Sequence, residues 1–250
     1  MSKISERLAK LGQTETTGFG FGVSTLTRKI PVILTVLTIH KQKDIKDVRA
    51  DALIMADGSK GALQPKTLRD TDIWGVSVSD GIDSDIDALV ESGADFLVIE
   101  TESTPGRALC GDDTGKGFVV DWNLPKKRAR AIDNGPFDFL ILDGSSIVLP
   151  LNVGGVLELQ EQIAYYSRHI FLRLTQLPTD QDLELLRDIG ISGLLYDVND
   201  AHTTEFAKLR ESIDRLEPKK DKRSSPAVLP SSESSLGESD VTEHEEEDWD

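Results

Sequence analysis

Cysteine is almost absent from this 250-residue chain, in which Cys110 stands alone. A single cysteine excludes an intrachain disulfide, and it excludes a cluster of thiolates able to hold zinc. Cys110 also lacks an obvious histidine partner that would activate it. We therefore expect Cys110 to be an unreactive packing residue.

Long apolar runs are missing as well. No stretch approaches the roughly 18 apolar residues that a membrane-spanning helix needs. The first residues, MSKISERLAKLGQ, are charged and amphipathic, and they contain no apolar core long enough for a signal peptide. These absences predict a soluble, cytoplasmic protein that has no contact with a membrane.

Basic residues are scarce relative to acidic ones. The chain has 28 Lys and Arg against 44 Asp and Glu, which gives a net charge of −16. Nine of the acidic residues follow position 223, where no Lys or Arg occurs, so residues 1–223 carry −7. A moderately acidic body argues against a nucleic-acid surface, which would need clustered Lys and Arg.

The C-terminal part of the chain, 218–250, differs in composition from the rest. It is rich in Lys, Ser and Pro at its start and almost purely acidic at its end, EHEEEDWD. Such a segment buries too little apolar surface to offset the entropy lost on ordering, so we predict that it is disordered. It is either a solubilising tail or a docking segment in which Trp249 contacts a protein partner.

Eight short apolar runs punctuate the remainder, and nearly every one ends in a polar or acidic residue. Strand-like runs separated by segments long enough for a helix are typical of βα units on a parallel sheet. Eight units match the count of a (β/α)₈ TIM barrel, which we predict for residues 30–217. The runs are 33–40, 52–57, 74–80, 96–102, 117–122, 139–144, 170–176 and 193–200.

The segments around these runs differ in helical character. Strong helices are expected in 83–93, 151–169, 179–190 and 201–217, the third with a capping box from Thr179 to Asp182. The first half of the barrel should be thinly covered outside. Residues 1–29 form an N-terminal extension with a short helix over 2–11 and a Gly-rich segment at 18–22, which we expect to close the bottom of the barrel.

Carboxylates recur where the predicted strands end. In a (β/α)₈ barrel the carboxyl ends of the strands form the active-site face. Asp121 and Asp143 end consecutive strands about 5 Å apart, and Glu100 ends the strand before them. Oxygen ligands of this kind suit Mg²⁺ or Mn²⁺. The alternative is that such Asp residues cap the next helix or bond to loop amides.

Two basic side chains also belong to predicted strand ends. His40 follows the first strand and has the chemistry of a general base near neutral pH, although a structural hydrogen-bonding role is also open. Arg173 lies inside a strand and must pair with a carboxylate or an anion. It either neutralises part of the acidic rim or orients the carboxylate of a substrate.

Two further absences narrow the chemistry. No predicted strand ends in a lysine placed for a Schiff base, which disfavours imine chemistry. The loops after the seventh and eighth runs, QLPTDQD and VNDAHTTEF, contain no glycine, so the usual backbone grip on a phosphate is missing. An unphosphorylated substrate is therefore expected.

Two passages, 91–109 and 183–198, share one form, in which a helix and a glycine precede a strand with an acidic end. Over about residues 1–217 the chain resembles a bacterial family of small (β/α)₈ TIM-barrel proteins, and that resemblance implies the fold. The chain is also similar to metal-dependent class II aldolases and lyases. These enzymes place carboxylate ligands on adjacent mid-barrel strands and a histidine near the first strand, as Asp121, Asp143 and His40 would lie here. The chain departs from them where their glycine-rich loops and the arginine for the substrate carboxylate would be expected.

Two hypotheses follow. The first is a lyase, aldolase or isomerase, assisted by Mg²⁺ or Mn²⁺, that acts on a small unphosphorylated oxo-acid. Asp121, Asp143 and Glu100 would hold the metal, His40 would move the proton, and Arg173 would steer the substrate carboxylate. The second hypothesis is a non-catalytic barrel that serves as a binding or scaffold protein and docks a partner through its acidic tail.

Overall fold

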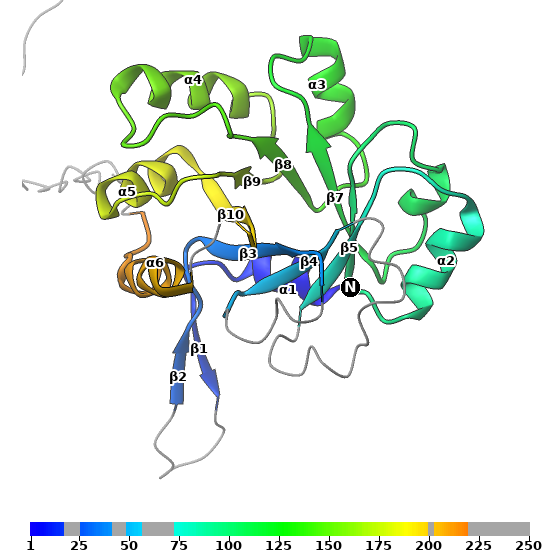
Figure 1. Ribbon diagram of the computed structural model, residues 1–250, viewed down its shortest axis with the longest axis horizontal. Helices are drawn as coiled ribbons and strands as arrows, with labels where there is room; N and C mark the ends of the chain where they lie inside the picture. Colours follow the sequence, from blue (N-terminus) through cyan, green and yellow to red (C-terminus); the bar gives the residue numbers. More distant parts are fainter. Residues whose placement is uncertain (18–25, 42–48, 57–72, 200–202, 220–250) are drawn as a thin grey trace, which may run out of the picture. The chain divides into compact units, whose positions relative to one another are not determined.

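Eight parallel strands form a closed barrel, with the neighbours in the order β10-β3-β4-β5-β6-β7-β8-β9 (Figure 1). The computed structural model describes residues 1–17, 26–41, 49–56, 73–199 and 203–219. The chain divides into two units, Met1–Lys219 and Lys220–Asp250, and the barrel belongs to the first. The predicted (β/α)₈ fold is confirmed. The predicted disorder of the tail concerns residues outside those described and stays a prediction.

Each barrel strand coincides with one of the eight apolar runs. Their inward and outward faces are both buried, as in other parallel sheets that helices cover. The barrel closes where β10 pairs with β3, with Gly193 opposite Leu34 and Asp197 opposite Thr38. The strands are β3 (Leu34–Ile39), β4 (Ala52–Met55), β5 (Trp74–Val78), β6 (Phe96–Ile99), β7 (Gly115–Val120), β8 (Phe139–Asp143), β9 (His169–Arg173) and β10 (Ile191–Asp197).

Within the described residues, helices follow five of the strands and cover the outside of the barrel (Figure 1). The four helices expected from the sequence are confirmed, and so is the capping box that joins Thr179 to Asp182 at the start of α5. The short α3 over Lys126–Asp133 was not predicted. The other four helices are α2 (Asp83–Glu91), α4 (Val153–Ile163), α5 (Asp180–Ile189) and α6 (Thr203–Arg215).

The β6–β7 connection, all of which lies within the described residues, has no α-helix. Between β6 and β7 the chain forms only the 3₁₀ helix η3, Gly106–Leu109. The connections after β3 and β4 run through 42–48 and 57–72, which lie outside the described residues. Cys110 follows η3 and is exposed, so the expectation that it is a packing residue is wrong. Its thiol lies 3.8 Å from the Gly106 carbonyl oxygen.

The N-terminal helix α1 (Lys3–Ala9) closes the bottom of the barrel. Ile4 and Leu8 are buried in the cluster of side chains that fills the barrel interior. The Asp95 carboxylate, just before β6, accepts hydrogen bonds from the amides of Lys3 and Ile4 at 2.7 and 2.8 Å. The Gly-rich segment 18–22, which we expected to take this role, lies outside the described residues.

A hairpin of β1 (Thr14–Thr17) and β2 (Leu26–Lys29) follows α1 and was not predicted. Thr14 pairs with Lys29 and Thr17 with Leu26, so the two strands are antiparallel. The hairpin forms a sheet of its own and takes no part in the barrel.

A layer of phenylalanines fills the barrel interior, and a glycine on the adjacent strand faces each of them. Phe139 stacks on Phe171 with ring centroids 4.5 Å apart, and Phe96 meets Phe139 edge-on at 5.7 Å. The large and small residues alternate around the barrel because three rings leave no space for side chains beside them. The register pairs Gly75 with Phe96, Gly117 with Phe139, and Gly193 with Phe171.

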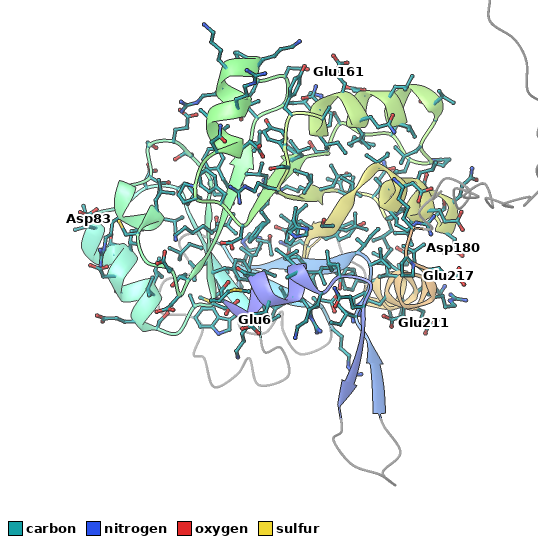
Figure 2. The ribbon with its side chains drawn as sticks, turned by 180° about the vertical axis from the view of Figure 1, so that it is seen from behind. Glu6, Asp83, Glu161, Asp180, Glu211 and Glu217 are labelled. Carbon is teal, nitrogen blue, oxygen red and sulfur yellow. The ribbon has the colours of Figure 1, made fainter. Side chains whose placement is uncertain are left out.

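Acidic side chains lie on the outer faces of the helices. Figure 2 shows this for several of them, and all of those named here are exposed. Within the described residues, none of the helices has both the length and the apolar character to cross a bilayer. The residues labelled on helices α1, α2, α4, α5 and α6 are Glu6, Asp83, Glu161, Asp180 and Glu211, and Glu217 follows the end of α6.

Candidate functional site

The predicted site residues gather at the carboxyl ends of the strands, at the end of the barrel opposite α1. Side chains alternate between the two faces of a strand. Val98, Ile141, Phe171 and Leu195 belong to the interior cluster, and Val119 packs against it. The residues two positions further on therefore face the mouth of the barrel. These residues are Glu100, Asp143, Arg173, Asp197 and Asp121.

His40 and Asp197 form a pair at this mouth. The His40 Nε2 atom lies 2.6 Å from Oδ2 of Asp197, and the two side chains are 41% and 33% exposed. Closure of the barrel brings them together, because Asp197 lies opposite Thr38 and His40 is two residues beyond Thr38 on the same face. The other carboxylate oxygen, Oδ1, accepts hydrogen bonds from the backbone amide and the side-chain amide of Asn199, at 2.9 and 2.8 Å.

The surroundings of Asp197 favour its ionised form. Partial burial by itself would raise the pKa of Asp197. The hydrogen bond to His40 and the two donors of Asn199 outweigh that effect, and the pKa is lowered. A carboxylate whose ionised form is favoured and that is held from one side can orient the imidazole and stabilise it when it takes up a proton.

Glu100, Arg173 and Ser77 form a second network across the mouth. Ser77 Oγ donates to Glu100 Oε1 at 2.7 Å, and Arg173 Nη2 lies 3.4 and 3.5 Å from the two carboxylate oxygens. Arg173 was expected to pair with a carboxylate or an anion, and here its partner is the Glu100 carboxylate. The geometry is loose, because a strong guanidinium–carboxylate hydrogen bond is shorter than 3 Å. An anion entering the mouth could therefore compete with Glu100 for Arg173.

Asp121 and Asp143 lie at equivalent ends of adjacent strands, as expected. Val120 and Leu142, the residues before them, are partners in the β7–β8 register. Both aspartates are exposed. Asp143 Oδ1 accepts the amide of Ser145 at 3.0 Å, which is the loop-bonding role that the sequence left open.

A three-carboxylate metal site is not assembled in the part of the chain that the structure describes. No group of three or more His, Cys, Asp or Glu side chains lies close enough there to hold a metal ion. Glu100 is bonded to Ser77 and Arg173, which leaves Asp121 and Asp143 as the carboxylates for a hard cation. Mg²⁺ is often held by one or two carboxylates with water completing the shell, and the oxygen atoms of this pair are ligands of the kind that it takes.

Asp197 and Ser77 are the members of the site that sequence reasoning gave no role. The sequence showed Asp197 as an acidic residue at the end of a predicted strand. The predicted closure of the barrel would have indicated that it contacts His40. In a closed barrel the first and last strands are neighbours, so their ends must meet. Ser77 is the residue before the last one of β5, and no sequence pattern marked it as a site residue.

The chain was compared with known proteins. No protein-family model and no curated protein sequence matches it. Solved structures match over about three quarters of its length. The 3-keto-L-gulonate-6-phosphate decarboxylase of Vibrio cholerae superposes with a TM-score of 0.58 at 14% identity, covering 74% of this chain and 99% of that one.

Two archaeal enzymes are also similar in structure. The orotidine 5′-phosphate decarboxylase of Pyrococcus horikoshii gives a TM-score of 0.56 at 10% identity, covering 73% of this chain and all of that one. The phosphoribosyl anthranilate isomerase of Thermococcus kodakaraensis gives 0.51 at 14% identity, covering 74% and 99%. At these identities the likeness establishes the (β/α)₈ barrel fold alone.

Proposed function

We propose that the chain is a lyase or isomerase that moves a proton beside the carbonyl group of a small, unphosphorylated oxo-acid. The observation that carries this proposal is the pair of His40 and Asp197 at the mouth of the barrel, 2.6 Å apart, with Asp197 fixed by Asn199. A histidine oriented by a carboxylate is a suitable general base at neutral pH.

Each side chain at the mouth has a separate role in the proposed proton transfer. Asp197 holds the imidazole through Nε2, and the ring takes up the substrate proton. The negative charge of Asp197 stabilises the imidazolium that forms. Arg173 exchanges its loose contact with Glu100 for the carboxylate of the substrate, and Ser77 keeps Glu100 hydrogen-bonded meanwhile.

A divalent cation has a place in this proposal. Asp121 and Asp143 would hold Mg²⁺ or Mn²⁺ through hard oxygen atoms, and Glu100 could join them once Arg173 has left it. When bound, the ion would polarise the carbonyl of the substrate and make the neighbouring proton more acidic.

Charge and loop composition support an unphosphorylated substrate. Among the described residues, four carboxylates and one arginine face the mouth, so a phosphate dianion would be repelled there more strongly than the single negative charge of a carboxylate. The loop between β9 and α5, residues 174–179, contains no glycine that would let backbone amides surround a phosphate. By contrast, the names of the similar decarboxylases contain a phosphate ester.

Hydrogen exchange in D₂O tests the proton transfer. The full chain, with Mn²⁺, is incubated with a panel of short unphosphorylated 2-oxo acids, and ¹H NMR follows loss of the signal from the carbon next to the carbonyl. We expect exchange with at least one acid, and a loss of about 100-fold or more in the His40→Gln variant. His169→Gln is the control, because His169 begins β9 at the opposite end of the barrel. No exchange with any acid would favour the binding or scaffold alternative.

A melting experiment tests the metal part separately. Mn²⁺ that binds only the folded chain raises the melting temperature through mass action. We expect the rise to disappear in the Asp121→Asn, Asp143→Asn double variant and to remain in Asp83→Asn, which changes an exposed carboxylate of α2. If the double variant responds to Mn²⁺ as the wild type does, the ion is bound elsewhere.

A further inference from the structure

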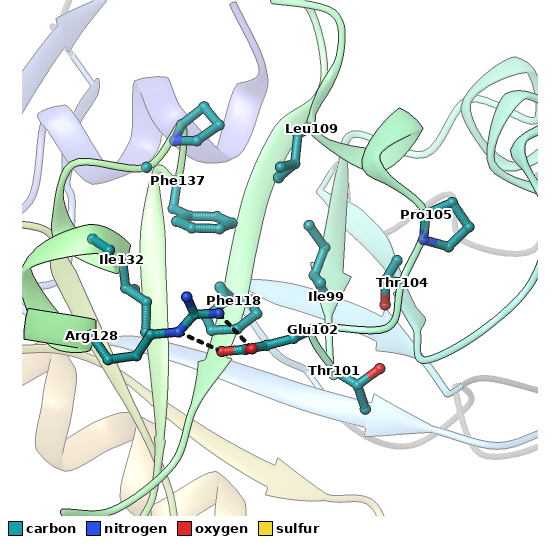
Figure 3. A pocket seen from close by; sticks show the side chains of 13 residues that line it. Ile99, Thr101, Glu102, Thr104, Pro105, Leu109, Phe118, Arg128, Ile132 and Phe137 are labelled. Atoms are coloured by element: carbon teal, nitrogen blue, oxygen red, sulfur yellow. Dashed lines mark hydrogen bonds and ion pairs between the residues drawn. The ribbon is translucent and has the colours of Figure 1, made fainter. Parts of the chain in front are cut away.

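The outer wall of the barrel is open beside the β6–β7 connection. The four-residue η3 replaces the helix that would cover β6 and β7 there. A pocket of about 270 Å³ opens between this connection, β7 and α3 (Figure 3). We call it the outer pocket; its apolar walls are Ile99, Leu109, Phe118, Ile132 and Phe137. It lies outside the barrel and takes no part in the site at the mouth.

The apolar surface of the outer pocket can be reached from solvent. Ile99, Phe118 and Ile132 form a floor that is at most 7% exposed, whereas Leu109 on η3 is 38% exposed. Phe118 and Phe137 stack with ring centroids 5.0 Å apart and an interplanar angle of 27°. Further aromatic rings pack well against such a pair, edge-on or offset.

The rim of the outer pocket is charged. Arg128 on α3 forms a bidentate ion pair with Glu102 (Figure 3). Its Nε atom lies 2.8 Å from Oε1 of Glu102, and its Nη2 atom lies 2.5 Å from Oε2. Both side chains are about half exposed, and the hydrogen bond and charge of Glu102 raise the pKa of Arg128. Exposed ion pairs contribute little to stability, so a carboxylate from outside could replace Glu102 at small cost.

α3 adds positive charge around this rim. It begins with KKRAR, in which four of five residues are basic, on a body whose net charge is −7. Lys127 precedes the pocket residue Ala131 by one helical turn and therefore lies on the same face. The electrostatic complement of this region is a negatively charged partner.

The size of the pocket decides what kind of partner fits. Its volume of about 270 Å³ is below the roughly 300–1,000 Å³ of sites for cofactors and similar small molecules. It suits a single large side chain, and aromatic side chains are the usual anchors of protein interfaces. We propose that the outer pocket is a docking site for a protein partner that inserts one aromatic side chain from a segment rich in Asp and Glu.

Fluorescence anisotropy with a labelled probe peptide tests this docking site on the full chain. The probe is an acidic peptide with one tryptophan at its centre. We expect saturable binding that weakens at least tenfold in Leu109→Gln, which makes the exposed wall polar, and in Arg128→Ala, which removes the charged rim. A peptide with alanine in place of the tryptophan should lose affinity to the same extent.

Matched variants distinguish specific docking from non-specific electrostatic attraction of the acidic probe and from misfolding of the variants. Arg215→Ala removes an equal charge from α6, and Val153→Gln changes an apolar side chain of α4 that is 76% exposed. Both should bind the probe as the wild type does, and urea unfolding should show that all four variants fold. Equal weakening by Arg128→Ala and Arg215→Ala would overturn the proposal, as would unchanged affinity of the peptide without tryptophan. Self-association of the chain that Leu109→Gln abolishes would also overturn it, by making a second copy the occupant.

Discussion

Two histidines at opposite ends of the barrel have different surroundings. His40 lies beside the Asp197 carboxylate at the mouth. His169 lies at the start of β9, and its Nδ1 atom is 3.1 Å from the hydroxyl of Ser192 on β10. Burial lowers the pKa of His169, and the Asp138 carboxylate offsets this only in part. The folded protein therefore disfavours a charged His169, and pH should change stability through this residue.

The sign of that effect can be tested with His169→Gln. A free histidine has a pKa of about 6.5, so below that pH the unfolded chain takes up a proton that folded His169 resists. Stability should fall as the pH drops from about 6.5 towards the lowered pKa of the folded state. We expect the unfolding free energy in urea to decrease less between about pH 7.5 and pH 5 in His169→Gln than in the wild type. Equal decreases in both proteins would contradict a role for His169.

Single residues of the site were predictable only in part. The positions of Asp121, Asp143, Glu100 and Arg173 at strand ends followed from the alternation of apolar and polar residues. Their partners did not follow, because a carboxylate at a strand end can bind a cation, a loop amide or an arginine equally well. Asp143 bonds to the Ser145 amide and Glu100 to Arg173, and nothing in either local sequence distinguishes the two.

At the scale of elements, the packing of neighbouring strands depends on glycine. A Cβ atom placed on Gly117 would lie 2.3 Å from the Phe139 ring, and one on Gly193 would lie 2.7 Å from the Phe171 ring. Both rings sit in a stack that also restricts their movement. The rings therefore cannot move aside, and β7 and β10 tolerate no side chain at these positions.

Gly117→Ala should consequently destabilise the barrel by about 1–3 kcal/mol, as overpacking of a dense core usually does. Gly106→Ala is the matched control, because a Cβ atom on Gly106 in η3 meets no atom within 4 Å. Its effect should stay within about 0.5 kcal/mol. Urea unfolding monitored by circular dichroism measures both. A similar loss in the two variants would mean that the effect comes from glycine flexibility and not from the phenylalanine layer.

The elements with strong local signals were those predicted from the sequence. α5 has a capping box at Thr179, a stop at Gly190 with φ of 109°, and an apolar face, so its limits could be predicted closely. α3 buries only Ala129 and Ile132 over eight residues, too few for a helical period to stand out. η3 is a four-residue 3₁₀ helix in the β6–β7 connection, and it is too short to produce a periodic pattern in the sequence.

For the whole molecule, the count of apolar runs was enough to predict the barrel. Closure of a parallel sheet depends on strand number, and each of the eight barrel strands overlaps an apolar run in the sequence. The hydrogen-bonded pair of His40 and Asp197 was not predicted, because its members are 157 positions apart and meet only through that closure. Long-range pairs of this kind depend on the topology and not on the residues around them.

The contact between the first and last barrel strands also has a consequence during synthesis. Of the barrel strands, β3 leaves the ribosome first, and β10 appears only after residues 191–197 have been added. Until then His40 has no carboxylate from β10 beside it, and the edge of β3 that later binds β10 has no partner strand. A translation product that stops before residue 191 therefore retains seven of the eight strands and cannot assemble the pair proposed to move protons.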